Sequence, residues 1–453
     1  MAKKSRPTSF LPDDVVGEVL LRLPSKSLAR FCSVCRSWKH LISSPAFVES
    51  HQALAAAKRP TKFAFAPTAP PHRWSLSACY DEPCYECPRV IGHKPCRGLV
   101  LLGQRCTRTY SVCNPSTGGR LRLPPCLAGY PYIKSSAGIG FHEPTGEYKV
   151  VVIAPSTDYR PKRCEVLTVG DPAGWRAPAG GSSSMPRTLD VDVKLDPVLA
   201  DGCLHWQLGC RNYSEHHGTV IVFSLAGESF RLVPLPPFAN DDVRRCYLDE
   251  NKRLPTANPR KPAYIRCTTP VGPVLAELGG RLCMLRDLRH RHDVDGTLEV
   301  WRLDDYDSGA WSLSYRVDLA EHAAKRLMTT WFVAPLCYLA GDCDSSDRIM
   351  LATTMQEVHV YDPKTRTLET VLSVVNVGEA ATSPERENVT DEVQQGSPFS
   401  LYDDRSEDLP SSKDYLRFVM FQESLVHLEG MEYGNSELEI LDACVSDKYS
   451  IYV

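Results

Sequence analysis

From about residue 96 to residue 375 the chain consists of short apolar segments separated by turn residues. Runs such as TYSVC, YKVVVIA and EVHVY are rich in β-branched and aromatic residues, and glycine, proline, asparagine and aspartate lie between them. Runs of this kind predict β-strands, and no long 3.6-residue period interrupts them. We therefore expect this region to be all-β.

Three of the turns share one chemistry, at residues 114–118, 143–146 and 362–365. Each begins with an acidic or amide residue followed by proline, and the first two end in glycine. Proline presets φ at the second position and glycine supplies a positive φ, so each turn predicts a hairpin. Further strand pairs are predicted in four segments: 164–175, 198–206, 220–235 and 277–285.

Hairpins that recur about every 40 to 60 residues with glycine and tryptophan are typical of a propeller or solenoid of sheets. A β-sandwich is the alternative, and the pattern does not fix the number of blades. Trp206, Trp301 and Trp311 are predicted core anchors. A ligand-facing role is the alternative for them, because tryptophan is enriched in binding hot spots.

Residues 10–47 have a different pattern, that of three short amphipathic helices. Pro12 suits the start of the first helix, Pro24 ends it, and Ser25 is a predicted N-cap of the second. Helices this short cannot bury their apolar stripes among themselves. The pattern leaves two alternatives open, a helical cap on the rest of the chain and a partner-binding module.

The order of residues in this stretch resembles an F-box. The matching parts are Leu11-Pro12 with the acidic pair behind it, Leu23-Pro24, Lys26-Ser27-Leu28, and Val34 to Trp38 before Leu41-Ile42. The resemblance implies docking onto the Skp-type linker of a cullin–RING ubiquitin ligase. The residues that it implies for this contact are Leu11, Pro12, Val16, Leu20, Leu23, Pro24, Leu28, Val34, Trp38 and Leu41.

Residues 96–428 resemble, more diffusely, the F-box-associated interaction domain of plants. The signatures appear in order at 97–102, 138–141, 201–206 and 421–428. This resemblance implies a kelch-like β domain that selects the protein to be ubiquitylated. Two inserts depart from the family pattern: a basic one at 240–270, predicted as a solvated loop with an arm for an acidic partner as the alternative, and one at 376–412.

The predicted fold class is α+β multidomain, with a small all-α F-box followed by a large, propeller-like all-β domain. The β domain is expected to have its own core, independent of the helices. The predicted division is a flexible basic N-terminus at 1–9, the F-box module at 10–58, a Pro- and Cys-rich linker at 59–95, the β domain at 96–375, an acidic disordered insert at 376–412, and closing strands at 413–453.

Composition excludes several classes of function. A formal net charge of −3 argues against a dedicated nucleic-acid binder, and no apolar run is long enough to span a bilayer. The N-terminus lacks the apolar core of a secretory signal. We therefore expect a protein of the cytoplasm, the nucleus or both, with its 18 cysteines reduced.

The closest approach to a metal site is Cys79, Cys84, Cys87 and Cys96, with His93 nearby. Zinc ribbons have two tight cysteine pairs and this set has one, so loop cysteines are the favoured interpretation. His216-His217 and His290/His292 with Asp293 have the residue types of metal ligands, but the latter pair, beside Arg289 and Arg291, is predicted as a solvated basic loop. No catalytic or nucleotide-binding motif occurs, so we predict no catalytic residue, no metal and no cofactor.

The combined hypothesis is a non-enzymatic substrate receptor of an SCF-type ubiquitin ligase. Its partners would be the Skp-type linker, the cullin–RING ligase reached through it, and an unidentified target protein, with neither nucleic acid nor membrane. One alternative is a propeller-like protein that binds a glycan or small ligand outside any ligase. The other is an enzyme on a propeller scaffold.

Deleting residues 378–410 is expected to leave the thermal stability of the β domain nearly unchanged. The 376–412 insert holds nine acidic residues against two arginines and few aromatic side chains, too little apolar surface to offset the entropy of ordering it. Differential scanning calorimetry of the deletion variant checks this. A large drop in Tm would mean that the insert packs against the domain.

Overall fold

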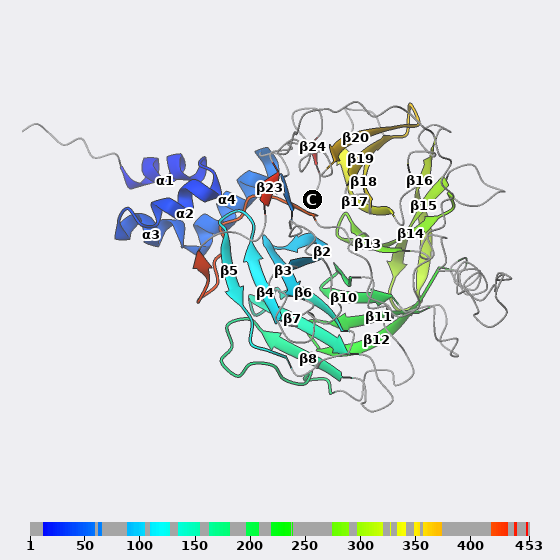
Figure 1. Cartoon of the computed structure of the whole chain (residues 1–453), viewed down its shortest axis with the longest axis horizontal. Helices are drawn as coiled ribbons and strands as arrows, with labels where there is room; N and C mark the ends of the chain where they lie inside the picture. Colours follow the sequence, from blue (N-terminus) through cyan, green and yellow to red (C-terminus); the bar gives the residue numbers. More distant parts are fainter. Residues whose placement is uncertain are drawn as a thin grey trace, which may run out of the picture.

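The structure is a computed structural model. It describes residues 12–58, 62–65, 88–104, 109–126, 135–154, 163–181, 196–207, 219–236, 274–289, 297–319, 333–340, 348–353, 357–373, 418–433, 439–441 and 450–451, with the single residues Phe238 and Leu327. In this part of the chain, four helices lie together at one side of a ring of β-sheets (Figure 1).

The helices are α1 (Asp13–Leu21), α2 (Ser25–Phe31), α3 (Arg36–Ile42) and α4 (Pro45–Lys58). Pro12 and Pro24 occupy the N-cap positions of α1 and α2, so Ser25, predicted as a cap, is the first helical residue instead. Pro45 both follows α3 and opens α4, where its missing N–H costs nothing. Leu20, Leu28, Ile42 and Phe47 form the helical core.

Five of the sheets in the described residues are blades made mainly of consecutive antiparallel strands. The first two contain β2 (Pro88–Cys96), β3 (Leu99–Gln104), β4 (Thr109–Asn114) and β5 (Gly119–Arg122), then β6 (Ser136–His142), β7 (Glu147–Ala154) and β8 (Arg163–Thr168). The third and fourth contain β9 (Val198–Ala200), β10 (Cys203–Gln207), β11 (Thr219–Ser224) and β12 (Ser229–Pro234), then β13 (Val274–Leu278), β14 (Arg281–Asp287), β15 (Thr297–Asp305) and β16 (Ala310–Asp318). The fifth contains β17 (Val333–Ala340), β18 (Arg348–Thr353), β19 (Glu357–Asp362) and β20 (Thr367–Ser373).

A sixth sheet, the closing sheet, joins the two ends of the β domain. In it β1 (Lys62–Phe65) lies between β21 (Phe418–Phe421) and β23 (Glu439–Leu441) and pairs antiparallel with both. Two further C-terminal strands extend blades: β22 (Glu432–Tyr433) pairs with β5, and β24 (Ser450–Ile451) pairs with β17.

The closing sheet corrects the predicted linker at 59–95. Both β1 and most of β2 fall inside that range, so the β domain begins at Lys62 rather than near residue 96. The sequence could not show this, because β1 is four residues long and its partners lie at the other end of the chain. A strand that short has too few residues to establish an alternating pattern.

Apolar clusters between neighbouring sheets close the ring. Successive residues of a strand point to opposite faces, and β1 uses this directly. Phe63 packs with Leu336 of the fifth blade, and Ala64 packs with Val90 of the first. The remaining four clusters join the first blade to the second and so on to the fifth. This arrangement is a propeller, which confirms the predicted architecture and excludes the sandwich.

All three predicted turns form hairpins. They connect β4 to β5, β6 to β7 and β19 to β20. Gly118 and Gly146 have φ of 74° and 68°, as their turns require, and Arg366 takes φ of 55° in the third. Of the three predicted tryptophan anchors, only Trp206 is fully buried; Trp301 and Trp311 are half-buried in the fourth blade.

A buried ionic cluster joins the second and third blades. The Glu228 carboxylate, 2% exposed, accepts hydrogen bonds from Lys149 Nζ at 2.8 Å and from Arg176 Nη1 and Nη2 at 2.5 and 2.6 Å. The backbone N–H of Ala179 donates a further bond at 2.8 Å. The hydrogen bonds from Arg176 are the main reason that the pKa of Glu228 falls from 4.5 to about 2.

Replacing this carboxylate is expected to destabilise the propeller. Glu228→Gln should lower the free energy of unfolding at pH 7 by about 3 kcal/mol, because the buried Lys149 and the partly buried Arg176 lose their counter-charge. In the wild type this contribution is complete above pH 4.5 and is lost as the pH falls towards 2, since the folded-state pKa is the lower one. The variant should lack that part of the acid dependence.

Urea unfolding at several pH values measures both effects. Glu432→Gln is the matched control, because Glu432 is exposed on β22. Equal stability of Glu228→Gln and wild type at pH 7 would contradict the assigned role of the cluster.

Candidate functional site

The residues predicted to contact the Skp-type linker protein divide into a surface set and a core set. Leu11 lies outside the described residues. Leu20 and Leu28 are 2% and 0% exposed inside the helical core, so they support the surface rather than form it. The remaining members are exposed (Pro12, Pro24, Val34) or half-buried against that core (Val16, Leu23, Trp38, Leu41).

Three exposed valines define what we call the apolar face of the helices: Val15, Val19 and Val34. They are 41%, 52% and 60% exposed, and they are three of the five large apolar side chains exposed in the described part of the chain. Val15 and Val19 lie one turn apart on α1, which places them side by side. The residues predicted from the sequence to contact the linker protein did not include Val15 or Val19. The apolar stripe on α1 nevertheless has more apolar residues than a single buried face requires.

An acidic side chain, Glu423, joins the helices to the propeller. Its Oε1 lies 2.7 Å from Lys62 Nζ on β1, and its Oε2 accepts a hydrogen bond from the backbone N–H of Ser25 at 3.2 Å. Glu423 is 6% exposed and its contact with Ser25 is buried, whereas the Lys62 side chain is partly exposed. Two residues later, Leu425 enters the helical core. The helices and the β domain therefore share a core, which corrects the expectation that they are independent.

The segment around Ser424 is in turn fixed to the first blade. Asn114 Nδ2 donates hydrogen bonds to the carbonyls of Ser424 and Val426, at 3.1 and 2.8 Å. Ser424 N donates to Ser116 Oγ at 2.9 Å. Gly98 permits the close approach, because a Cβ there would lie 2.2 Å from Ser424 Oγ. Glu423 therefore connects the helices to a C-terminal segment that is itself hydrogen-bonded to the first blade.

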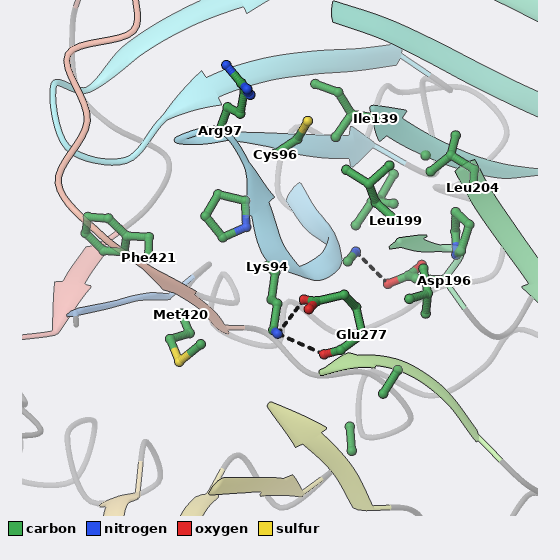
Figure 2. Close-up of a pocket in the computed structure, with 18 of the residues that line it drawn as sticks. Lys94, Cys96, Arg97, Ile139, Asp196, Leu199, Leu204, Glu277, Met420 and Phe421 are labelled. Atoms are coloured by element: carbon green, nitrogen blue, oxygen red, sulfur yellow. Dashed lines mark hydrogen bonds and ion pairs between the residues drawn. The ribbon is translucent and has the colours of Figure 1, made fainter. Parts of the chain in front are cut away.

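The second candidate site is a cavity of about 370 Å³ along the axis of the propeller, the axial cavity (Figure 2). The first strand of each blade and β21 contribute to its wall. Its lining includes Ile91, Lys94, Ile139, Asp196, Leu199, Leu204, Gln207, Ala276, Glu277, Ala334, Met420 and Phe421, with Gln52 of α4 and Glu423.

A bulge in β2 carries a lysine across this cavity. Between Ile91 and Cys96 the strand takes five residue steps, while the paired residues on β3 take two. The extra residues project Lys94 to the fourth blade, on the opposite side of the ring, where Nζ lies 2.5 Å from Glu277 Oε2 and 2.8 Å from Glu277 O (Figure 2). The ion pair therefore joins opposite walls of the axial cavity.

The cysteine set considered for zinc is only partly described. Cys79, Cys84 and Cys87 lie outside the described residues, as do His216, His217, His290, His292 and Asp293. Cys96 is buried between the first two blades, and burial raises the pKa of its thiol to about 12. No group of three or more potential metal ligands occurs within the described ranges, and none of the four helices there is long and apolar enough to cross a membrane.

Comparison with known families agrees with this geometry. Residues 9–50 match the F-box domain, and residues 54–389 match the F-box associated beta propeller domain. The second match covers well over half of the chain. The chain therefore belongs to the F-box proteins that carry an F-box associated β-propeller domain.

Its relatives include proteins of Arabidopsis thaliana. Putative F-box protein At1g33530 is 30% identical over 251 residues, 52% of this chain and 53% of that protein. F-box protein At5g10340 is 24% identical over 376 residues, 74% of this chain and 75% of that protein. The chain spans about half to three quarters of the length of these relatives. Among solved structures, a streptogramin B lyase matches with a TM-score of 0.26 and 11% identity over 63% of this chain and 83% of that one. This similarity is too low to assign a function to the chain.

Removing the Glu423 carboxylate should loosen the helices from the propeller. In Glu423→Ala, the Ser25 N–H and the Lys62 ammonium lose a buried acceptor, which costs about 1–3 kcal/mol. Hydrogen exchange should then accelerate in α2 and β1. Glu429→Ala, an exposed position on the same segment, is the control and should exchange like wild type. Unchanged exchange in α2 would show that Glu423 does not seat the helices.

Proposed function

We propose that this protein is the substrate-recognition adaptor of an SCF-type cullin–RING ubiquitin ligase. The helices dock a Skp-type linker, and the propeller binds the protein to be ubiquitylated. The chain itself contributes no catalytic group. Its role is proximity, because a tethered target lysine meets activated ubiquitin at a high effective concentration.

The observation that carries this proposal is the apolar face of the helices. Single exposed apolar residues are ordinary on a protein surface, but a group of them marks an interaction site. Here Val15 and Val19 lie one turn apart on α1, and Val34 lies in the turn before α3, the helix that carries the half-buried Trp38 and Leu41. The match to the F-box domain over residues 9–50 covers this module.

The attachment through Glu423 suits an adaptor. A target must be held at a defined position relative to the linker, and an orientation fixed by buried contacts provides this without a flexible tether. We place the protein's action in the cytoplasm or nucleus. Nine cysteines in the described segments are thiols rather than disulfides, as a reducing compartment favours.

Charging the apolar face should abolish linker binding. The double substitution Val15→Asp and Val19→Asp places carboxylates where an apolar partner surface would cover them, and burying an unpaired charge costs several kcal/mol. About 4 kcal/mol corresponds to a thousandfold weaker affinity. Isothermal titration of the full chain with a purified Skp-type linker measures the loss.

Leu313→Asp is the matched control, because Leu313 is 42% exposed on β16 of the propeller. Its affinity for the linker should equal that of wild type. Circular dichroism must show that the double variant is folded. A folded double variant that keeps its linker affinity would refute the proposed docking face.

A further inference from the structure

We propose that the axial cavity binds a small, uncharged, largely apolar molecule that carries a hydroxyl group. The site is separate from the apolar face of the helices, and the proposal does not rest on membership of a ligase. It follows from the size of the cavity, from its walls, and from the polar groups placed in them.

The size and the walls of the cavity favour a small organic molecule. Ligand pockets range over roughly 300–1,000 Å³ with mostly apolar linings, and this cavity of about 370 Å³ falls at the lower end. Ile139, Leu199, Leu204 and Phe421 supply apolar side chains from three different sheets (Figure 2). Because these sheets belong to one closed ring, the site is formed before a ligand arrives, which lowers the entropic cost of binding.

The wall of the axial cavity contains a buried hydrogen-bond acceptor that lacks a donor. Gln207, at the end of β10, is 8% exposed, and its Oε1 is buried without a hydrogen-bond partner. Buried polar atoms of this kind are uncommon because leaving them unpaired is costly. A ligand hydroxyl supplies an O–H for such an acceptor.

The charged groups favour a neutral ligand with acceptor capacity as well. Lys94 uses two of its three N–H groups on Glu277, which leaves one to donate towards a ligand oxygen. A charged ligand would compete with this ion pair and disturb a contact between opposite walls. A hydroxyl group both donates and accepts, so one such group can serve Gln207 or the ion pair without adding charge.

The occupant would also lie against the attachment of the helices. Gln52 of α4 and Glu423 both line the axial cavity. Glu423 holds the Ser25 N–H and Lys62, so a ligand packed beside it restricts the same segment. Occupancy should therefore slow hydrogen exchange in α2 as well as around the cavity.

The test uses the full chain and the uncharged fluorophore N-phenyl-1-naphthylamine, whose emission rises in an apolar site. We expect saturable binding of one probe per chain. 2-Naphthol should displace it about tenfold more effectively than 2-methylnaphthalene, because only the naphthol carries the hydroxyl group. In Gln207→Leu this preference should shrink while the affinity for the probe is retained.

Leu199→Trp should abolish probe binding by filling the cavity. Leu313→Trp, the same change on an exposed outer strand, should leave binding intact. Hydrogen exchange of the wild type with the probe decides the question even if Leu199→Trp does not fold. Slower exchange at residues 92–98, 198–207 and 274–277 supports the site. Absence of saturable binding, slower exchange confined to α1, or unchanged binding in folded Leu199→Trp would overturn it.

Discussion

The pairing of β1 with strands from the far end of the chain is the interaction on which the rest of the structure depends. A ring of packed sheets leaves no apolar sheet face uncovered only if its last interface forms, and here that interface is built around four residues, Lys62–Phe65. Phe63 and Ala64 face opposite neighbours, so one short strand completes the cores on both of its sides. Without it the first and fifth blades would each expose an apolar face. The axial cavity exists because this ring is closed.

The same C-terminal segment then determines where the helices lie. After β21, Glu423 reaches Ser25 and Lys62, and Leu425 completes the helical core. Ring closure and helix placement are therefore parts of one structure, in which propeller and helices share residues. The apolar face on α1 and the turn before α3 is held at a defined angle to the propeller, as the proposed adaptor role requires.

Local chemistry explains what could be predicted from the sequence. The three hairpin turns depend on residues adjacent in the chain, and the F-box resemblance depends on a contiguous stretch. Burial on the helices was harder to predict: Leu20 and Leu28 share the motif with the exposed Val34, and only packing separates core from surface. The prediction that residues 59–95 form a linker was wrong, because Lys62 and its partner Glu423 are 361 positions apart in the chain. The axial cavity was also not predicted, since each strand contributes one or a few side chains and none forms a recognisable motif.

The place of Glu423 and Leu425 in the chain has a consequence for biosynthesis. Helices α1 to α4 leave the ribosome before the propeller, yet their core lacks Leu425 and their attachment lacks Glu423 until all five blades have been made. Domains generally fold as units during synthesis, from the N-terminus onward. Here the helices are completed by a segment that follows the fifth blade in the chain. A chain that ends before Glu423 would therefore present helices that are incompletely packed and not fixed to the propeller, so complete packing of the helices distinguishes finished molecules from fragments.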